Sequence, residues 1–296
     1  MKQTPIDVSV IILNFNTKDL TRACLSSIRA SKLGKYVIET IVVDNASTDD
    51  TDKMVQRDFP EVLFIQNGKN VGFAAGNNPG IRRAKGRFVL LLNSDTEVSH
   101  QAFAEMIGFM DTHPKCGAAT VKLLLTDGTM DPACHRGFPT PWNAFTYYMK
   151  LEKVFPKVKP FAGYHQGYKD LSTPHEVDSI SGAFFMVRKE VIEQVGMLDE
   201  SYFMYAEDID WAFRIKSSGW QIWFNPRATV LHRKKQSGRS HFLKDRRVTS
   251  HRYFLTYNRL FYTKNYEKKY SGFVNWLVYA SFDVQLWFLL KLGIAL

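Results

Sequence analysis

The feature that most constrains the fold is an uninterrupted apolar run that ends abruptly in polar residues. Phe88–Leu92 is apolar at every position, which is typical of a strand buried on both faces of a parallel sheet. Open α/β sheets bind ligands outside the carboxyl ends of their strands, so Asp95, just beyond this run, is expected to meet a substrate or a metal ion. Asn93–Thr96 also suits a turn that caps a following helix, so this stretch alone leaves both interpretations open.

Shorter apolar stretches precede this run, and each ends in polar residues. Val8–Leu13, Val37–Val43 and Val62–Ile65 predict buried strands, each followed by a segment that we expect to be helical. Because strand–helix–strand crossovers are right-handed, these strands should be parallel, with their carboxyl ends at one edge of the sheet. The polar side chains expected together at that edge are Asn14, Asp44, Asn45 and Asp95.

A loop rich in glycine and asparagine, Asn67–Asn78, leads into the helix before the central strand. Such residues suit positive φ angles and close approach of a backbone to a ligand. Neither GxGxxG nor GxxxxGK[ST] occurs, so the two best-known phosphate loops are absent from this crevice. A diphosphate bound here would need another counter-charge, and a divalent cation held by Asp95 could supply it.

The middle of the chain is less regular. We expect a helix over His100–His113, a strand over Gly117–Leu125 and another strand over Ile180–Val187. The latter begins with the small residues Ser181–Ala183, where a backbone can pass close to a ligand. Pro132–Pro174 shows no periodicity, and we interpret it as a loop that shapes a substrate site.

Three carboxylates, Glu207, Asp208 and Asp210, open a predicted helix within Tyr205–Arg214. The helix dipole alone can account for acids in a first turn. It does not account for the bulky side chains around them, which would raise the basicity of a carboxylate and suit it to act as a general base. These neighbours are Tyr202, Phe203, Met204, Tyr205 and Trp211.

One histidine, His232, follows two short predicted strands, Ile222–Phe224 and Ala228–Leu231. A histidine at a strand end is usually only a polar terminus. As a neutral imidazole near Asp95, however, His232 would be a suitable metal ligand.

Composition limits the class of protein. With 296 residues, 45% of them hydrophobic, the chain can form one large α/β domain or two small ones. The start of the sequence shows no charged region followed by an apolar one, so we expect no secretory signal. The three cysteines, Cys24, Cys116 and Cys134, lack metal-ligand spacing, which fits reduced thiols in a cytosolic protein.

The net charge of +10 is concentrated near the C-terminus, where Arg227–Lys269 holds thirteen Lys or Arg against two acids. Aromatic residues interrupt this basic stretch, and the mostly apolar Phe273–Leu296 follows. This order favours an anionic membrane surface over nucleic acid, the other partner of basic aromatic segments. We expect interfacial attachment; the alternatives for the tail are packing on the protein's own surface or a homodimer interface. The interleaved aromatics are Tyr253, Phe254, Tyr257, Phe261, Tyr262 and Tyr266.

Several motifs, in this order along the chain, resemble those of the inverting family 2 glycosyltransferases. Within that family the sequence is most similar to bacterial rhamnosyltransferases and galactofuranosyltransferases. The similarity runs from about Val8 to His232, and its specificity lies in the order of motifs that are each weak alone. The motifs are SVIILNFN at 9–16, VVDNASTD at 42–49, NVGFAAGNN at 70–78, LLNSD at 91–95, SGAFFMVR at 181–188, and ED at 207–208 with Trp211 nearby.

This resemblance implies the GT-A fold, a Rossmann-like, mostly parallel central sheet flanked by helices, here with a basic helical C-terminal extension. It also implies a nucleotide-sugar donor and Mg²⁺ or Mn²⁺. Asn93–Asp95 fills the place of the family's DXD motif, although Asn93 replaces the first acid and brings less charge to the metal. The implied metal ligands are Asp95 and His232, and the catalytic base is Asp208 with Glu207 beside it. The implied nucleotide-sugar contacts are Asn14, Asp44, Asn45, Asn70, Gly72, Asn77, Asn93, Ser94 and Asp95, and the acceptor contacts are Gly182, Ala183 and Trp211.

The hypothesis from the sequence is thus an inverting glycosyltransferase of bacterial cell-surface glycan synthesis, peripheral on the inner face of the cell membrane. The resemblance favours dTDP-L-rhamnose as donor and a lipid-linked or polysaccharide acceptor, with UDP-galactofuranose or a UDP-hexose as alternative donors. We expect residues 1–235 to form the transferase domain, with 1–98 binding nucleotide and 99–235 binding acceptor, and 236–296 to form the basic extension. A nucleotidyltransferase and an inactive membrane-tethered binding module are the other classes considered.

Overall fold

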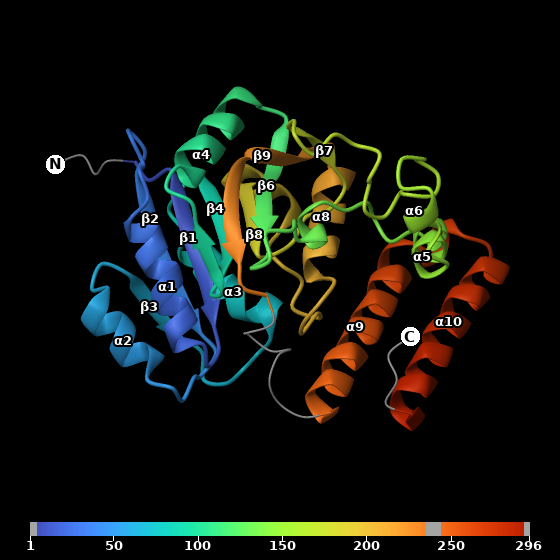
Figure 1. Ribbon diagram of the computed structural model, residues 1–296. Coiled ribbons are helices and arrows are strands. Elements are labelled where there is room, and N and C mark those ends of the chain that lie inside the picture. Colours follow the sequence, from blue (N-terminus) through green and yellow to red (C-terminus); the bar gives the residue numbers. More distant parts are fainter. Residues whose placement is uncertain (1–4, 235–243, 293–296) are drawn as a thin grey trace.

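A single mixed sheet runs through the computed structural model, which describes residues 5–234 and 244–292 (Figure 1). In this described part the sheet has nine strands in the order β3-β2-β1-β4-β8-β6-β9-β5, with β7 paired to β9. Helices flank it, and a pair of long helices lies to one side (Figure 1). The strands are β1 (Val8–Asn14), β2 (Ile38–Asp44), β3 (Leu63–Gln66), β4 (Phe88–Asn93), β5 (Thr96–Val98), β6 (Cys116–Leu124), β7 (His175–Val177), β8 (Phe184–Arg188) and β9 (Gln221–His232).

The first four strands are parallel, as the sequence predicts. Asn14 pairs with Asp44, and Leu13 pairs with Asn93, so the ends of β1, β2 and β4 lie at one edge. β4 is completely buried apart from Asn93, in agreement with its unbroken apolar sequence. The helices between these strands are α1 (Lys18–Arg29), α2 (Thr51–Asp58) and α3 (Phe73–Arg83).

The second half of the sheet is mixed. β8 is antiparallel to both β4 and β6, whereas β6 and β9 are parallel. The two strands predicted near residues 222–231 form the single strand β9, with a shift in register after Asn225, next to Pro226, which has no N–H to donate. Three helices of this half are α4 (Ala102–Thr112), α7 (Lys189–Val195) and α8 (Glu207–Ser217).

A short strand, β5, directly follows Asp95, where the sequence alone predicts only a turn. β5 runs antiparallel to β9 and pairs Thr96 with His232. Because of this pairing, the last residue of β9 lies beside the end of β4. The structure therefore brings together two residues that are more than 130 positions apart in sequence.

The segment 132–174 contains local structure that its lack of periodicity does not reveal. It holds a 3-10 turn at Pro132–Cys134, then α5 (Pro141–Tyr148) and α6 (Leu151–Val154), before the chain reaches β7. Asp131 and Thr140 cap the first two of these elements with side-chain acceptors, and a proline begins each. The segment projects from the sheet toward the two C-terminal helices (Figure 1).

The C-terminal extension is helical, with α9 (Lys244–Asn265), a 3-10 turn at Glu267–Lys269 and α10 (Gly272–Leu292). The sequence predicts that its aromatic residues lie at a membrane interface. That expectation is corrected for Phe261, Tyr262 and Tyr266, which are buried in a cluster with Tyr202 and Ile209 and so attach α9 to α8. The predicted boundary near residue 235, the basic residues Lys235 and Arg239, and the last four residues of the tail lie outside the described residues.

Candidate active site

Asn14 is the centre of a hydrogen-bond network at the ends of β1 and β2. Its Nδ2 donates to Asp44 Oδ1 at 2.7 Å and to Ser47 Oγ at 2.9 Å, and its Oδ1 accepts from the hydroxyls of Thr17 and Thr21. Asp44 is buried and also accepts from the Ser47 backbone N–H at 2.7 Å. Asn14 and Asp44 therefore fix the shape of this turn.

Asn45 links the next turn to the glycine-rich loop. Its Nδ2 donates to Gly72 O at 3.0 Å and to Asn70 Oδ1 at 3.2 Å. Gly72 has a φ of +86°, and a Cβ there would lie 2.2 Å from Phe203 O, so only glycine fits this contact. Asn77 is instead buried within α3, where its side chain donates to Phe73 O at 2.9 Å.

Asn93 and Ser94 connect the end of β4 to both neighbouring elements. The Asn93 N–H donates to Ala183 O at 3.1 Å, and Ser94 Oγ lies 3.0 Å from Thr17 Oγ1. The structure thus gathers at one edge nearly all the residues predicted to bind the nucleotide sugar, with Asn77 set apart in its helix.

Asp95 and His232 lie together, as required of the two predicted metal ligands. Asp95 Oδ1 is 3.3 Å from His232 Nε2, and both side chains are almost completely buried. On the other side of the ring, His232 Nδ1 lies 2.9 Å from Asp131 Oδ2, and Lys234 Nζ donates to Asp131 Oδ1 at 2.8 Å. We name Asp95, Asp131, His232 and Lys234 the histidine cluster.

The pKa values of His232 and Asp131 are set by burial and by the charged side chains around them. Burial alone would lower the pKa of His232, but the carboxylates of Asp131 and Asp95 raise it to about 9. Burial would likewise raise the pKa of Asp131, but bonds from His232 and Lys234 outweigh burial and hold this pKa below its usual range. The carboxyl groups on either side of the ring therefore favour the protonated imidazole.

The donor set of the histidine cluster fits a divalent metal ion. A metal-binding histidine usually gives its second N–H to a carboxylate, and Asp131 accepts from Nδ1 and so leaves Nε2 directed toward Asp95. A metal ion would replace the proton on Nε2, because ligation requires the neutral ring. In the described part of the chain no three His, Cys, Asp or Glu side chains are grouped to hold a metal by themselves. Donor phosphate oxygens would have to complete the coordination.

A second group of charges lies at the start of α8, where Arg136 pairs with Asp208. Arg136 Nη2 donates to Asp208 Oδ2 at 2.8 Å, and both side chains are largely buried. Asp208 also accepts from the backbone N–H groups of Gly182, at 3.3 Å, and Ile209, at 2.8 Å. These contacts fix the orientation of the carboxylate. We name Arg136, Glu207 and Asp208 the arginine cluster.

Glu207 has a different environment from its neighbour Asp208. It is buried, and its Oε2 has no hydrogen-bond partner among the residues described here. Burial and the adjacent Asp208 carboxylate raise the pKa of Glu207. Tyr205 and Ala206, just before it, have φ values of +73° and +66°, a left-handed conformation that is costly for such residues and is concentrated at functional sites.

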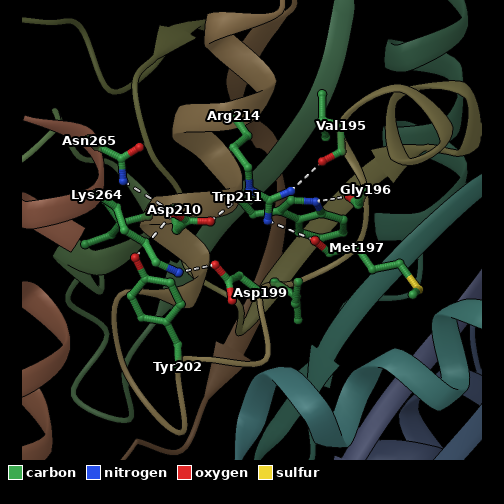
Figure 2. A network of polar contacts seen from close by, with 12 residues as sticks. Val195, Gly196, Met197, Asp199, Tyr202, Asp210, Trp211, Arg214, Lys264 and Asn265 are labelled. Atoms are coloured by element: carbon green, nitrogen blue, oxygen red, sulfur yellow. Dashed lines mark hydrogen bonds and ion pairs between the residues drawn. The ribbon is translucent and has the colours of Figure 1, made fainter. Parts of the chain in front are cut away.

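The third acid of this helix, Asp210, is part of the scaffold (Figure 2). Arg214 donates to Asp210 Oδ2 at 2.8 Å and to the carbonyls of Val195 and Met197. Asn265 of α9 also donates to Asp210, at 3.3 Å. These bonds hold α8 between the segment after α7 and the C-terminal extension.

The predicted acceptor contacts have two different outcomes. Gly182 donates to Asp208, while Ala183 accepts from Asn93, so this short segment joins the β4 edge to the arginine cluster. Trp211 is 0% exposed, and its indole N–H donates to Gly196 O at 2.9 Å (Figure 2). Because no surface of Trp211 is accessible, we leave it out of the proposed acceptor site.

Sequence reasoning missed Asp131 and Arg136. Both lie at or near the start of the unassigned segment, where no strand or helix pattern predicts their position. Arg136 is placed by main-chain bonds to Ser179, and Asp131 by a bond from its N–H to Leu123 O. The one local signal is the Asp131-Pro132 pair, which predicts a capped turn and not a partner for His232.

The fold is shared with solved nucleotide-sugar enzymes. Similar structures include the mannosyltransferase PcManGT from Pyrobaculum calidifontis in complex with GDP-Man and Mn²⁺, with a TM-score of 0.61, 17% identity, and coverage of 96% of this chain and 71% of that one. S. aureus TarS 1-349 in complex with UDP-GlcNAc matches with a TM-score of 0.59, 17% identity, and coverage of 96% and 73%. The chain therefore has the GT-A fold that the sequence predicts.

The sequence comparison gives the family. Residues 9–196 match the model of glycosyl transferase family 2, and the chain belongs to this family. One relative, the N-acetylglucosaminyl-diphospho-decaprenol L-rhamnosyltransferase of Mycobacterium tuberculosis, is 25% identical over 225 residues, or 68% of each chain. Another, the low-salt glycan biosynthesis hexosyltransferase Agl10 of Haloferax volcanii, is 27% identical over 221 residues, 73% of this chain and 64% of its own. The protein is a glycosyltransferase.

Proposed function

We propose that the protein transfers L-rhamnose from dTDP-L-rhamnose, with inversion, to a hydroxyl of a lipid-linked or polysaccharide acceptor in bacterial cell-surface glycan synthesis. The observation that carries the proposal is that the segment Gly182–Ala183 joins the end of β4, beside the metal-compatible histidine cluster, to an oriented Asp208. The mycobacterial relative supports the choice of donor sugar and of a lipid diphosphate acceptor through its name.

On the donor side, the β1, β2 and β4 ends form the nucleotide pocket. Asn45, Asn70 and Gly72 shape the loop beside the nucleoside, and Asn93 and Ser94 lie next to the phosphates. Asp95 and His232 would hold Mg²⁺ or Mn²⁺. A divalent ion there would neutralise charge on the departing nucleoside diphosphate, a contribution of several kcal/mol.

On the acceptor side, the Asp208 carboxylate takes the proton of the acceptor hydroxyl as the hydroxyl oxygen attacks the anomeric carbon. The C–O bond to the diphosphate breaks on the opposite face, so the configuration inverts. Arg136 and the Gly182 N–H position the carboxylate. Glu207, whose raised pKa favours the protonated acid, can donate a hydrogen bond to the acceptor.

We place the enzyme at the inner face of the cell membrane, attached through its C-terminal extension. In the described residues, α10 is the one helix long and apolar enough to cross a membrane, and little of it is buried. Arg259 of α9 pairs with Asp283 of α10, so the two helices form a joined pair. Surface attachment fits a helix that stays packed on α9 better than a crossing does.

The experiment is a panel of nucleotide sugars assayed with Mn²⁺, Mg²⁺ or EDTA, following nucleoside diphosphate release. We expect metal-dependent release from dTDP-L-rhamnose above all other donors. Preferential turnover of UDP-galactofuranose or a UDP-hexose would overturn the choice of rhamnose while keeping the class of reaction. Failure to bind any donor would instead favour an inactive binding module.

A further inference from the structure

The exposed tip of the insertion, residues 147–160, carries a large apolar surface. Met149 is 59% exposed and Val154 is 67% exposed, and Phe155 and Val158 are also exposed. These side chains come from the end of α5, from α6 and from the loop that follows. Clustered apolar groups of this kind on a surface mark a binding site.

The basic side chains of the same tip are exposed, whereas its acidic side chain is not. Lys150, Lys153, Lys157 and Lys159 are all exposed. Glu152, the one acid between residues 141 and 169, is turned inward, and its Oε1 lies 2.7 Å from His165 Nδ1. The outer surface of the tip is therefore apolar and positively charged, with no acid to balance it.

This combination of exposed apolar and basic side chains favours a lipid surface over a protein partner. Lysine is depleted in the buried core of protein interfaces, because burying its charge is costly. At the surface of a bilayer the same residues are favourable, since apolar groups enter the acyl boundary while lysines reach anionic head groups. The alternation of both kinds along 149–159 fits an anionic lipid surface.

The tip is joined to α10. Tyr148, at the end of α5, lies near Gln285 of α10: burial raises the pKa of Tyr148 to about 12, and the Gln285 side chain lowers it in part. Two polar residues of α10 contact α9: Asn275 accepts a hydrogen bond from Tyr262, and Asp283, which stays largely exposed, pairs with Arg259. The exposed side of α10 carries large apolar side chains at helical spacing, which we name the α10 stripe: Phe273, Trp276, Leu277, Val284, Trp287 and Leu290.

We propose that residues 147–160 form a second membrane-docking element, which inserts Val154 and Phe155 at an anionic lipid surface beside the α10 stripe. This goes beyond attachment by the C-terminal extension and does not depend on the donor or on catalysis. The insertion also carries Arg136, which contacts Asp208, so docking would place the arginine cluster near the bilayer. That last consequence rests on the proposed lipid-linked acceptor.

The first test uses a fluorophore at the tip of the full-length protein. The three native cysteines are buried, so Val154→Cys can be labelled selectively with an environment-sensitive dye. Leu63→Cys, on the edge strand β3 and also exposed, is the matched control. With phosphatidylcholine vesicles containing phosphatidylglycerol, we expect a blue shift at position 154 and none at position 63.

The second test separates the tip from α10. Lys150→Glu/Lys153→Glu is compared with Lys85→Glu/Lys189→Glu, which reverses two exposed charges outside the tip. Each lysine at an anionic surface contributes roughly fivefold in affinity. We therefore expect vesicle flotation of the tip variant to weaken at least tenfold, while the control variant matches the wild type.

Several results would overturn the proposal. These are no shift at position 154 although the protein floats with vesicles, an equal shift on pure phosphatidylcholine, and unchanged flotation of the tip variant. A shift that appears without vesicles as protein concentration rises would assign the tip to a homodimer interface instead. Nucleoside diphosphate release without vesicles is measured on each variant, so failure of the proposed transfer reaction is seen separately from failure of docking.

Discussion

The histidine and arginine clusters of the candidate active site arrange two carboxyl groups differently around a basic side chain. In the histidine cluster, the two carboxylates Asp95 and Asp131 enclose one imidazole. In the arginine cluster, one guanidinium pairs with Asp208 and leaves Glu207 without a charged partner. The first arrangement can exchange one cation for another, as a binding site must. The second gives two adjacent carboxyl groups different environments, which is how acid and base roles are separated.

The largest effect is expected for Asp208→Asn. If the arginine cluster performs proton transfer, the amide cannot accept the proton, and kcat should fall on the order of 10²- to 10⁴-fold. Steady-state transfer to acceptor measures this directly. Near wild-type turnover would remove Asp208 from the role of base.

The next prediction concerns metal binding by the histidine cluster and uses the variant Asp131→Asn. Asp131 bonds to Nδ1 of His232 and so fixes the ring, and loss of such a partner typically weakens metal affinity about 10- to 100-fold. We expect activity to return at high Mn²⁺ concentration in a metal titration. Asp127→Asn, in an exposed turn of the same loop, is the matched control. A titration curve identical to the wild type would contradict the metal assignment.

Arg136→Lys should have a smaller effect. The lysine keeps a positive charge but lacks the planar guanidinium, whose Nη2 donates to both Asp208 Oδ2 and Ile180 O. We expect kcat to fall about tenfold, the loss of about 1.4 kcal/mol, with the donor KM unchanged. An equal change in donor KM would mean that Arg136 acts on the donor and not on Asp208.

The smallest effect concerns stability. Between the ordinary pKa of glutamate, 4.5, and the raised pKa of Glu207, the folded state holds a proton that the unfolded state has lost. Wild-type stability should therefore fall as pH rises through this window, by at most about 1.4 kcal/mol per pH unit from this group. Urea unfolding of wild type and Glu207→Gln across the window should show the variant gaining relative stability as pH rises. A constant difference would contradict the raised pKa.

The two clusters also differ in how far the sequence could predict them. Asn14, Asp44 and Asp95 follow apolar strands, and parallel strands must bring their ends to one edge, so their meeting is predictable. Asp131 and Arg136 lie where no periodicity exists, and their positions depend on tertiary pairing with Leu123 and Ser179. The sequence therefore predicts that His232 can lie near Asp95, but not that Asp131 lies behind the ring. It does not predict Arg136 as the partner of Asp208.

The C-terminal extension shows a second limit of sequence patterns. Aromatic residues among lysines and arginines have the same composition whether they meet lipid or a neighbouring helix. At the end of α9 the deciding factor is a neighbouring surface, formed by Ile209 of α8 and by Tyr202 before it, which buries Phe261, Tyr262 and Tyr266. For α10, the sequence shows polar residues around the helix, but only the structure shows that Asn275 and Asp283 face α9 partners.

The division of labour between the two clusters is tested most directly by donor titration calorimetry of Asp95→Asn and Asp208→Asn, each with and without Mn²⁺. We predict that Asp208→Asn binds dTDP-L-rhamnose with wild-type affinity and wild-type dependence on Mn²⁺, although its turnover is lost. Asp95→Asn should lose the part of the affinity that depends on Mn²⁺. Loss of Mn²⁺-dependent donor binding in Asp208→Asn, or its retention in Asp95→Asn, would contradict the account.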